Sequence, residues 1–255
     1  MTTPVLQDFP VVHAVTDSAI LLHDDFLPRA LGIMRALGRR GALHLRSSKA
    51  SGQRLHELAM ALATYQRGTG CWLIVNDRVD IAAAVNARGV QLASHSLTIA
   101  QARAVSPNRA VGASVHTVEE AIEAEAAGAS WVVAGTVFET PSHAGRLPAR
   151  LEFVELVAKA VRIPVIAIGG VRPEDVASLR SAGAYGVATI RGAGWDYEVD
   201  SSDNQDMLLK TRLPVTSESG FSEPVTRYIS AYDSDSGSGR DDLPDGKRSP
   251  EGPVT

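Results

Sequence analysis

The sequence contains a single cysteine, Cys71, among 255 residues, so no intramolecular disulfide can form and a reducing compartment is indicated. Lysine is scarce, no run of Lys or Arg stands out, and the formal net charge is -4. This composition argues against a nucleic-acid-binding protein. No apolar run reaches the roughly 18 residues that a membrane span needs, and the first residues are neither basic nor continuously apolar. We therefore expect a cytoplasmic protein that binds neither nucleic acid nor a membrane.

The length and the 44% hydrophobic content suit one principal domain with a single large core. We place this domain at residues 1–232, with a polar insertion at about 196–220 and a last helix at 221–232. Residues 233–255 consist mainly of Asp, Ser, Gly, Pro and Arg. Such a segment cannot bury enough apolar surface to offset its chain entropy, so we expect a disordered C-terminal tail.

Eight apolar, β-rich segments alternate with amphipathic segments along most of the chain. Strands that are apolar throughout, each followed by a helix, predict a parallel sheet covered by helices. Eight such units predict an α/β protein with a closed (β/α)8 TIM barrel, whereas a doubly wound open sheet normally has fewer units. The predicted strands are residues 11–16, 41–46, 72–76, 90–93, 111–116, 131–138, 165–169 and 186–190. The predicted helices between them are 26–37, 53–66, 81–87, 99–104, 118–127, 151–161 and 173–182.

Small and polar residues follow several of these strands, at the sheet edge where α/β proteins bind their ligands. Gly170 follows the seventh strand, and Ile190 and Arg191 follow the eighth. In barrels of this class these two loops commonly bind a phosphate through bare backbone N–H groups. The alternative is that Gly169 and Gly170 only make a tight turn before the next helix.

Asn76 and Asp77 end the third strand. The Asp77 carboxylate suits a divalent cation or the orientation of a base, and Asn76 suits a hydrogen bond to a heterocycle. The structural alternative is that Asp77 caps the following helix and that Arg78 pairs with Asp80 on the surface.

His44 and Arg46 lie two residues apart on the second strand, so their side chains point to the same side. If that side is the barrel interior, Arg46 meets a phosphate or carboxylate and His44 can move a proton. A buried histidine with satisfied hydrogen bonds is the competing interpretation of His44. His116 is interpreted as structural, and His95 and His143 as loop residues on the ligand side.

Six ordered motifs resemble the thiamine phosphate synthase/TenI superfamily over about residues 11–195. They are residues 44–46 (HLR), 73–80 (LIVNDRVD), 89–92 (GVQL), 112–116 (GASVH), 135–140 (GTVFET) and 163–170 (IPVIAIGG). The resemblance implies a (β/α)8 barrel, in agreement with the strand count. It also assigns Ser114, in the fourth of these motifs, to substrate binding.

The synthase branch of this superfamily joins a pyrimidine diphosphate to a thiazole phosphate with Mg²⁺. Its pattern has Gln-Leu-Arg-Glu-Lys after the second strand, where this chain has Ser47 and Ser48 in place of Glu-Lys. Its acidic pair after the fourth strand is His95-Ser96 here, and His143 stands at the position of a diphosphate-binding lysine. These changes remove charge from a Mg²⁺–diphosphate site, so the synthase is our second choice, with Asp77 as the metal ligand.

The TenI branch is a thiazole tautomerase that needs no metal. Its catalytic histidine corresponds to Thr136, so the resemblance leaves His44 or His143 to transfer the proton. Our first expectation is a TenI-like isomerase of thiamine biosynthesis that aromatises a carboxylated thiazole phosphate without a cofactor. Arg46 and Asn76 would then contact the carboxylate or the ring.

A third interpretation is a non-catalytic barrel that binds a phosphorylated ligand and has a regulatory role. In each case the expected partner is a small molecule, and the sequence leaves a homo-oligomer open.

Overall fold

A computed structural model describes residues 9–139, 150–195 and 223–234 of the chain. The predicted site residue His143 and the predicted insertion at 196–220 lie outside these ranges. The same holds for the predicted tail from residue 235 onward, whereas residues 233 and 234 end the last helix. No helix in the described part of the chain is both long and apolar enough to cross a membrane.

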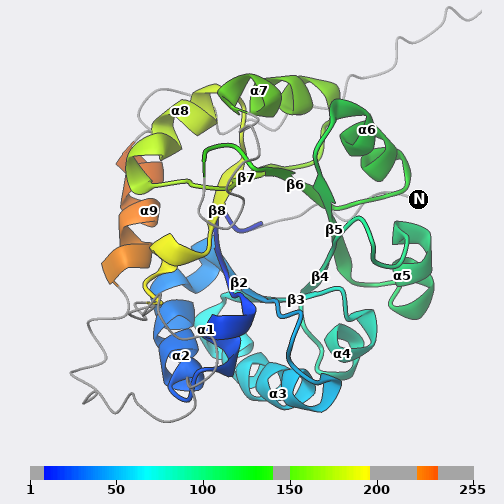
Figure 1. Ribbon diagram of the computed structural model, residues 1–255, viewed down its shortest axis with the longest axis vertical. Coiled ribbons are helices and arrows are strands. Elements are labelled where there is room, and N and C mark those ends of the chain that lie inside the picture. Colours follow the sequence, from blue (N-terminus) through cyan, green and yellow to red (C-terminus); the bar gives the residue numbers. More distant parts are fainter. Residues whose placement is uncertain (1–8, 140–149, 196–222, 235–255) are drawn as a thin grey trace, which may run out of the picture.

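Eight parallel strands in the described residues form a closed barrel, in which each strand pairs with its neighbours in the sequence and β8 pairs with β1. Figure 1 shows the strands at the centre of the molecule and the helices in a ring outside them. The prediction of a (β/α)8 barrel is confirmed, and all eight predicted strands are present. They are β1 (Val12–Val15), β2 (Gly41–Leu45), β3 (Trp72–Asn76), β4 (Gly89–Leu92), β5 (Ala110–Val115), β6 (Trp131–Gly135), β7 (Val165–Ile168) and β8 (Gly186–Thr189).

The helices follow the predicted order, with two differences. A short helix that we did not predict, α1, precedes α2, and the region predicted as one helix at 173–182 divides into a 3-10 turn and α8. The described helices are α1 (Ser18–Leu22), α2 (Phe26–Leu37), α3 (Gly52–Thr69), α4 (Val79–Ala84), α5 (Ile99–Val105), α6 (Val118–Ala126), α7 (Arg150–Ala160), α8 (Val176–Ser181) and α9 (Glu223–Ser234). Single 3-10 turns are η1 (Gly38–Arg40), η3 (Pro173–Asp175) and η4 (Arg191–Ala193).

Local capping explains two of these helix starts. Asp17 caps α1, because its carboxylate accepts a hydrogen bond from the backbone N–H of Ile20 at 2.9 Å. Thr117 caps α6 in the same way, through the N–H of Glu120 at 3.1 Å. The Glu120 carboxylate then accepts the N–H of His116, which gives His116 the structural role that we predicted for it.

The buried apolar residues form two layers, one outside the strands and one inside the barrel, as the two-residue period of the strands requires. The outer layer lies between the strands and the helices, contains most of the core and divides into two clusters. The inner layer contains strand residues and no helix residue, so it fills the barrel interior. Phe9 belongs to the inner layer, where its ring contacts those of His13, Trp72, Trp131 and Tyr185.

The last described helix, α9, completes the ring by packing against both α8 and α2 (Figure 1). Its Tyr228 is buried, and the hydroxyl donates to the carbonyl oxygen of Val171 at 2.9 Å and lies 3.4 Å from the Thr189 hydroxyl. Since Val171 follows β7 and Thr189 ends β8, Tyr228 joins the two loops where we predicted a phosphate site.

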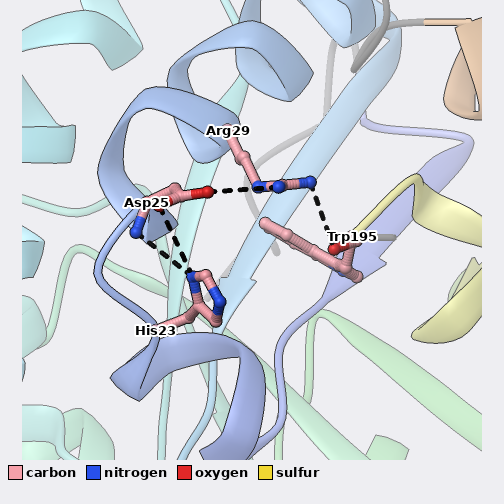
Figure 2. A network of polar contacts seen from close by, with 4 residues as sticks. All are labelled: His23, Asp25, Arg29 and Trp195. Atoms are coloured by element: carbon pink, nitrogen blue, oxygen red, sulfur yellow. Dashed lines mark hydrogen bonds and ion pairs between the residues drawn. The ribbon is translucent and has the colours of Figure 1, made fainter. Parts of the chain in front are cut away.

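A polar network holds the segment after β8 against α2 (Figure 2). Arg29 donates to the backbone oxygen of Trp195 at 3.5 Å and pairs with Asp25 at 3.2 Å. The Trp195 ring stacks on Phe26, with centroids 5.8 Å apart, and His23 accepts the N–H of Asp25 at 3.2 Å. This network fixes the chain at the point where it leaves the barrel.

Candidate functional site

Four polar side chains from adjacent strands occupy interior positions of the barrel toward the carboxyl ends of the strands. They are His44 on β2, Asn76 on β3, Gln91 on β4 and Ser114 on β5. Each lies an even number of residues from a position on its own or the neighbouring strand's interior face, so its side chain points into the barrel. Three of the four were predicted as site residues. Parallel strands bring them together because their carboxyl ends meet at one rim of the barrel.

His44 belongs to a buried pair with His13 of β1, a residue that we did not predict. Nδ1 of His13 lies 2.8 Å from Nε2 of His44, and both side chains are buried. The far nitrogen of His13 lies 3.1 Å from the carbonyl oxygen of Pro10. On the other side, Nδ1 of His44 lies 3.4 Å from Oδ1 of the Asn76 amide. The position of His44 therefore agrees with the competing interpretation, a buried histidine with hydrogen-bond partners.

Burial lowers the pKa of His13 from 6.5 to about 4. Burial also lowers the pKa of His44 well below 6.5, and the neighbouring His13 adds to this effect. Both rings are therefore neutral at neutral pH. Burial therefore shifts both pKa values downward, whereas a nearby phosphate anion would raise the pKa of a histidine.

The histidine pair predicts a loss of stability in mild acid. The folded rings resist protonation, whereas the same rings in the unfolded chain bind protons below about pH 6.5, so stability falls as the pH drops toward about 4. From His13 alone we expect about 2 kcal/mol less free energy of unfolding at about pH 5 than at about pH 7. Urea unfolding at both pH values measures this difference. His13→Phe lacks one titrating ring and should flatten the dependence; an equal slope in both proteins contradicts the prediction.

Ser114 is oriented by a second buried chain of hydrogen bonds. The indole N–H of Trp131 donates to Oε1 of Gln91 at 2.8 Å, and Nε2 of Gln91 donates to the Ser114 hydroxyl at 3.1 Å. Gly112 makes room for this chain, since a Cβ there would overlap both the indole of Trp131 and the amide of Gln91. The Gln91 orientation is thus fixed by an N–H donor on one side, which leaves its NH₂ group for Ser114.

Asp77 lies directly after β3 with a positive φ of 63°, and the turn after β4 folds around its carboxylate. Oδ1 accepts the backbone N–H of Ala93 at 3.0 Å and a short hydrogen bond from the hydroxyl of Ser96. His95, in the same turn, is exposed. In the described part of the chain no three His, Cys, Asp or Glu side chains gather as metal ligands.

The alternative that Arg78 and Asp80 form a surface pair is confirmed. The guanidinium donates twice to the carboxylate, at 2.9 and 2.6 Å, and this hydrogen bonding lowers the pKa of Asp80. Asp77 is not the N-cap of α4, because Arg78 holds that position. Of the two carboxylates that follow β3, Asp80 is therefore the one paired with an arginine.

Arg46 is exposed just beyond the end of β2, while His44 lies inside the barrel. The hydroxyl of Thr16 fixes the Arg46 backbone, because it accepts the N–H and donates to the carbonyl oxygen, both at 2.8 Å. The Arg46 backbone is therefore held in place at the rim where the other predicted residues lie.

Gly169 and Gly170, after β7, both have positive φ, at 105° and 65°. A Cβ on Gly169 would overlap Thr136, and one on Gly170 would lie 2.7 Å from the carbonyl oxygen of Glu139. These glycines therefore let the loop after β6 approach the loop after β7, and Phe138 donates its N–H to the oxygen of Gly169 at 2.9 Å. Thr136 is half-buried at this contact.

A cavity of about 360 Å³ lies beside the loops after β7 and β8. Its lining carries three arginines, which are Arg172, Arg191 and Arg227, and one carboxylate, that of Glu174. Arg191 begins the single turn η4 directly after Ile190. The predicted phosphate residues Ile190 and Arg191 therefore lie at a basic rim.

Sequence reasoning missed His13, Gln91 and Trp131 as parts of the site. A histidine, a glutamine and a tryptophan within otherwise apolar strands were the available signals, since a buried polar group needs a partner. The identity of each partner depends on which strands become neighbours.

The family described as thiamine monophosphate synthase matches residues 12–193. A thiamine-phosphate synthase of Chlorobium luteolum is 43% identical over 168 residues, which cover 65% of this chain and 77% of the relative. A thiamine-phosphate synthase of Pyrococcus abyssi is 38% identical over 164 residues, covering 64% of this chain and 79% of the relative. The solved structure of thiamine phosphate pyrophosphorylase from Pyrococcus furiosus matches with a TM-score of 0.69 and 26% identity, covering 89% of this chain and 96% of that one.

Proposed function

Because this chain belongs to the thiamine monophosphate synthase family, we propose that it is an enzyme that joins a pyrimidine diphosphate to a thiazole phosphate and releases diphosphate. The observation that carries this proposal is the 43% identity to a protein named thiamine-phosphate synthase. The match in fold to a thiamine phosphate pyrophosphorylase supports it.

Our first expectation, a TenI-like thiazole isomerase, is wrong. The relatives at 34–43% identity carry the synthase name, which was our second choice. We had given most weight to the substitutions at His95, Ser96 and His143, whereas similarity along the whole barrel favours the synthase. The structure also removes one reason for the isomerase, because His44 is a buried neutral ring and not an exposed acid or base.

We assign the two substrates to two parts of the rim. The pyrimidine lies over Asn76 and Ser114, whose side chains end two buried hydrogen-bonded chains. The thiazole phosphate lies at Gly170, Ile190 and Arg191, where two loops meet beside three arginines. Rigid buried partners hold Asn76 and Ser114 in one orientation, which favours alignment of the reacting groups.

Asp77 is the residue that would hold Mg²⁺. Magnesium is commonly bound by one or two carboxylates together with substrate phosphates and water, so the Asp77 carboxylate at the rim fits an ion that arrives with the diphosphate. When bound, the ion would neutralise charge on the departing diphosphate. Ser96 supplies a hydroxyl beside Asp77, and this hydroxyl already donates to the carboxylate.

Restoring a second carboxylate beside Asp77 should tighten magnesium binding. We expect Ser96→Asp to lower the Mg²⁺ concentration for half-maximal activity about tenfold, because two carboxylates attract the ion more strongly than one. Ser94→Asp adds the same charge at an exposed position of the same turn and should change little. Activity titrated with Mg²⁺ in the three proteins measures this, and equal midpoints contradict the assignment of Asp77.

The function is tested with purified protein, both substrates and Mg²⁺, with thiamine phosphate and diphosphate as the products measured. We expect equal amounts of the two products, and no coupling when either substrate is omitted. Binding of thiazole phosphate without any coupling would instead favour the non-catalytic regulatory barrel. Calorimetry with thiazole phosphate alone separates these outcomes.

A further inference from the structure

The hydrogen-bonded chain from Pro10 through His13 and His44 to Asn76 has a direction, which follows from its acceptors and donors. A backbone carbonyl oxygen can only accept, so Nε2 of His13, 3.1 Å from the oxygen of Pro10, carries the hydrogen. In a neutral ring the other nitrogen, Nδ1, is then an acceptor. Nε2 of His44, 2.8 Å away, must therefore donate to it.

The same accounting determines the orientation of Asn76. Since His44 carries its hydrogen on Nε2, its Nδ1 is an acceptor and faces the Asn76 amide at 3.4 Å. With Oδ1 of Asn76 at this position two acceptors would face each other. The oxygen and nitrogen of an amide group have nearly the same shape, so we assign the exchanged orientation, in which the NH₂ group donates to His44. The Asn76 oxygen then faces the opposite way. Because Asn76 is half-buried at the carboxyl end of β3, that oxygen faces the ligand side.

We propose that His13 is a positioning residue, which through His44 holds the Asn76 carbonyl oxygen toward the substrate to accept an N–H of a nitrogen heterocycle. The proposal rests on the proposed function, in which the heterocycle is the pyrimidine. His13 itself lies too deep for contact with the substrate, since it is fully buried beside Phe9.

The surroundings of the pair favour a role of this kind over simple packing. The neighbouring interior positions hold Val15, Ala42 and Ile74, and apolar side chains at 13 and 44 would fill the same region without buried polar atoms. The polar chain instead begins at a backbone oxygen below the barrel and ends at a rim side chain. Each hydrogen-bonding group in it has one partner, and the last partner is the residue at the ligand edge.

The kinetic test compares two substitutions of His13. Phe removes the acceptor but keeps an aromatic ring beside Phe9, whereas Gln retains one acceptor and one donor. We expect His13→Phe to raise KM for the pyrimidine substrate roughly tenfold, because the freed Asn76 amide no longer presents its oxygen. KM for the thiazole phosphate should stay unchanged, and His13→Gln should restore the pyrimidine KM. An unchanged pyrimidine KM in folded His13→Phe, or equal rises in both KM values, would overturn the proposal.

A second measurement does not depend on activity. Nitrogen-15 NMR of the imidazole rings in the wild-type protein should show His13 and His44 neutral at neutral pH, each with its hydrogen on Nε2. A hydrogen on Nδ1 of either ring, or a charged ring, would overturn the proposal even in an active enzyme. If the protein makes no thiamine phosphate but shows these tautomers, the proposed function fails while the positioning chain stands. Calorimetry with the pyrimidine diphosphate then replaces kinetics, with the same roughly tenfold loss of affinity expected in His13→Phe.

Discussion

Replacing Asp77 by Asn is expected to lower the rate of thiamine phosphate formation about 10²- to 10³-fold, the cost typical of losing a group that stabilises charge in a transition state. The Asp77 carboxylate lies at the rim and accepts hydrogen bonds from Ala93 and Ser96, whereas Asp80 is held by Arg78. Without it, the charge of the departing diphosphate is not neutralised by a bound cation. Steady-state rates at saturating substrates and several Mg²⁺ concentrations measure the effect.

Asparagine is chosen because it separates charge from local structure. Its side-chain oxygen can still accept the N–H of Ala93 and the hydroxyl of Ser96, so the turn after β4 keeps its contacts. Ser96→Ala is the matched control, because it removes one of these hydrogen bonds and leaves the carboxylate. We expect Ser96→Ala to retain most of the activity. Full activity of Asp77→Asn, or an equal loss in Ser96→Ala, would remove Asp77 from the proposed metal site.

Replacing Gly112 by Ala is expected to lower the free energy of unfolding by about 3 kcal/mol, at the upper end of the usual cost of overpacking. The added Cβ would overlap the indole of Trp131 and the amide of Gln91, and both side chains are buried. Either the two residues shift and break their 2.8 Å hydrogen bond, or the strands separate. Since Gln91 also orients Ser114, activity should fall as well. Urea unfolding at neutral pH measures the stability change.

Gly68→Ala is the matched control for this substitution. Gly68 lies near the end of α3, is exposed, and would have no atom within 4 Å of an added Cβ. Alanine in a helix is more favourable than glycine, so we expect a gain of about 0.5 to 1 kcal/mol. If Gly112→Ala were as stable as the wild type, the close packing of Trp131 on β5 would not be a feature of the native barrel.

The fold was predictable because its signals are local. Each strand is an apolar run, each helix has an amphipathic pattern, and Thr117 and Gly183 mark a helix start and a helix end. The missed helix α1 is only five residues long, too short for a periodic pattern. The strand predicted to continue to residue 138 stops at Gly135, because the following residues leave the barrel to contact the loop after β7.

The functional prediction failed at its finest level, the choice between two branches of one superfamily. That choice was made from a few positions that depart from the synthase pattern, such as Ser96 and His143, and these are weak evidence because neighbouring groups can take over a role. The proposed roles of Arg46, Ser114, Gly170, Ile190 and Arg191 stay predictions. The role of Asp77 also stays a prediction, and both sequence and structure place its carboxylate at the carboxyl end of β3.

The sequence by itself determined the barrel and the rim on which the site was predicted, because these follow from eight apolar runs that alternate with amphipathic segments. Since the strands are apolar throughout, it did not determine which side of each strand faces inward. Only the tertiary structure decided the partners. His13 meets His44 across 31 positions of sequence, and Gln91 meets Trp131 across 40. The physical reason is that such contacts depend on the pairing register between neighbouring strands and on the closure of the barrel. A strand's own residues specify neither of these, so the orientation of Asn76 and Ser114 became visible only in the folded chain.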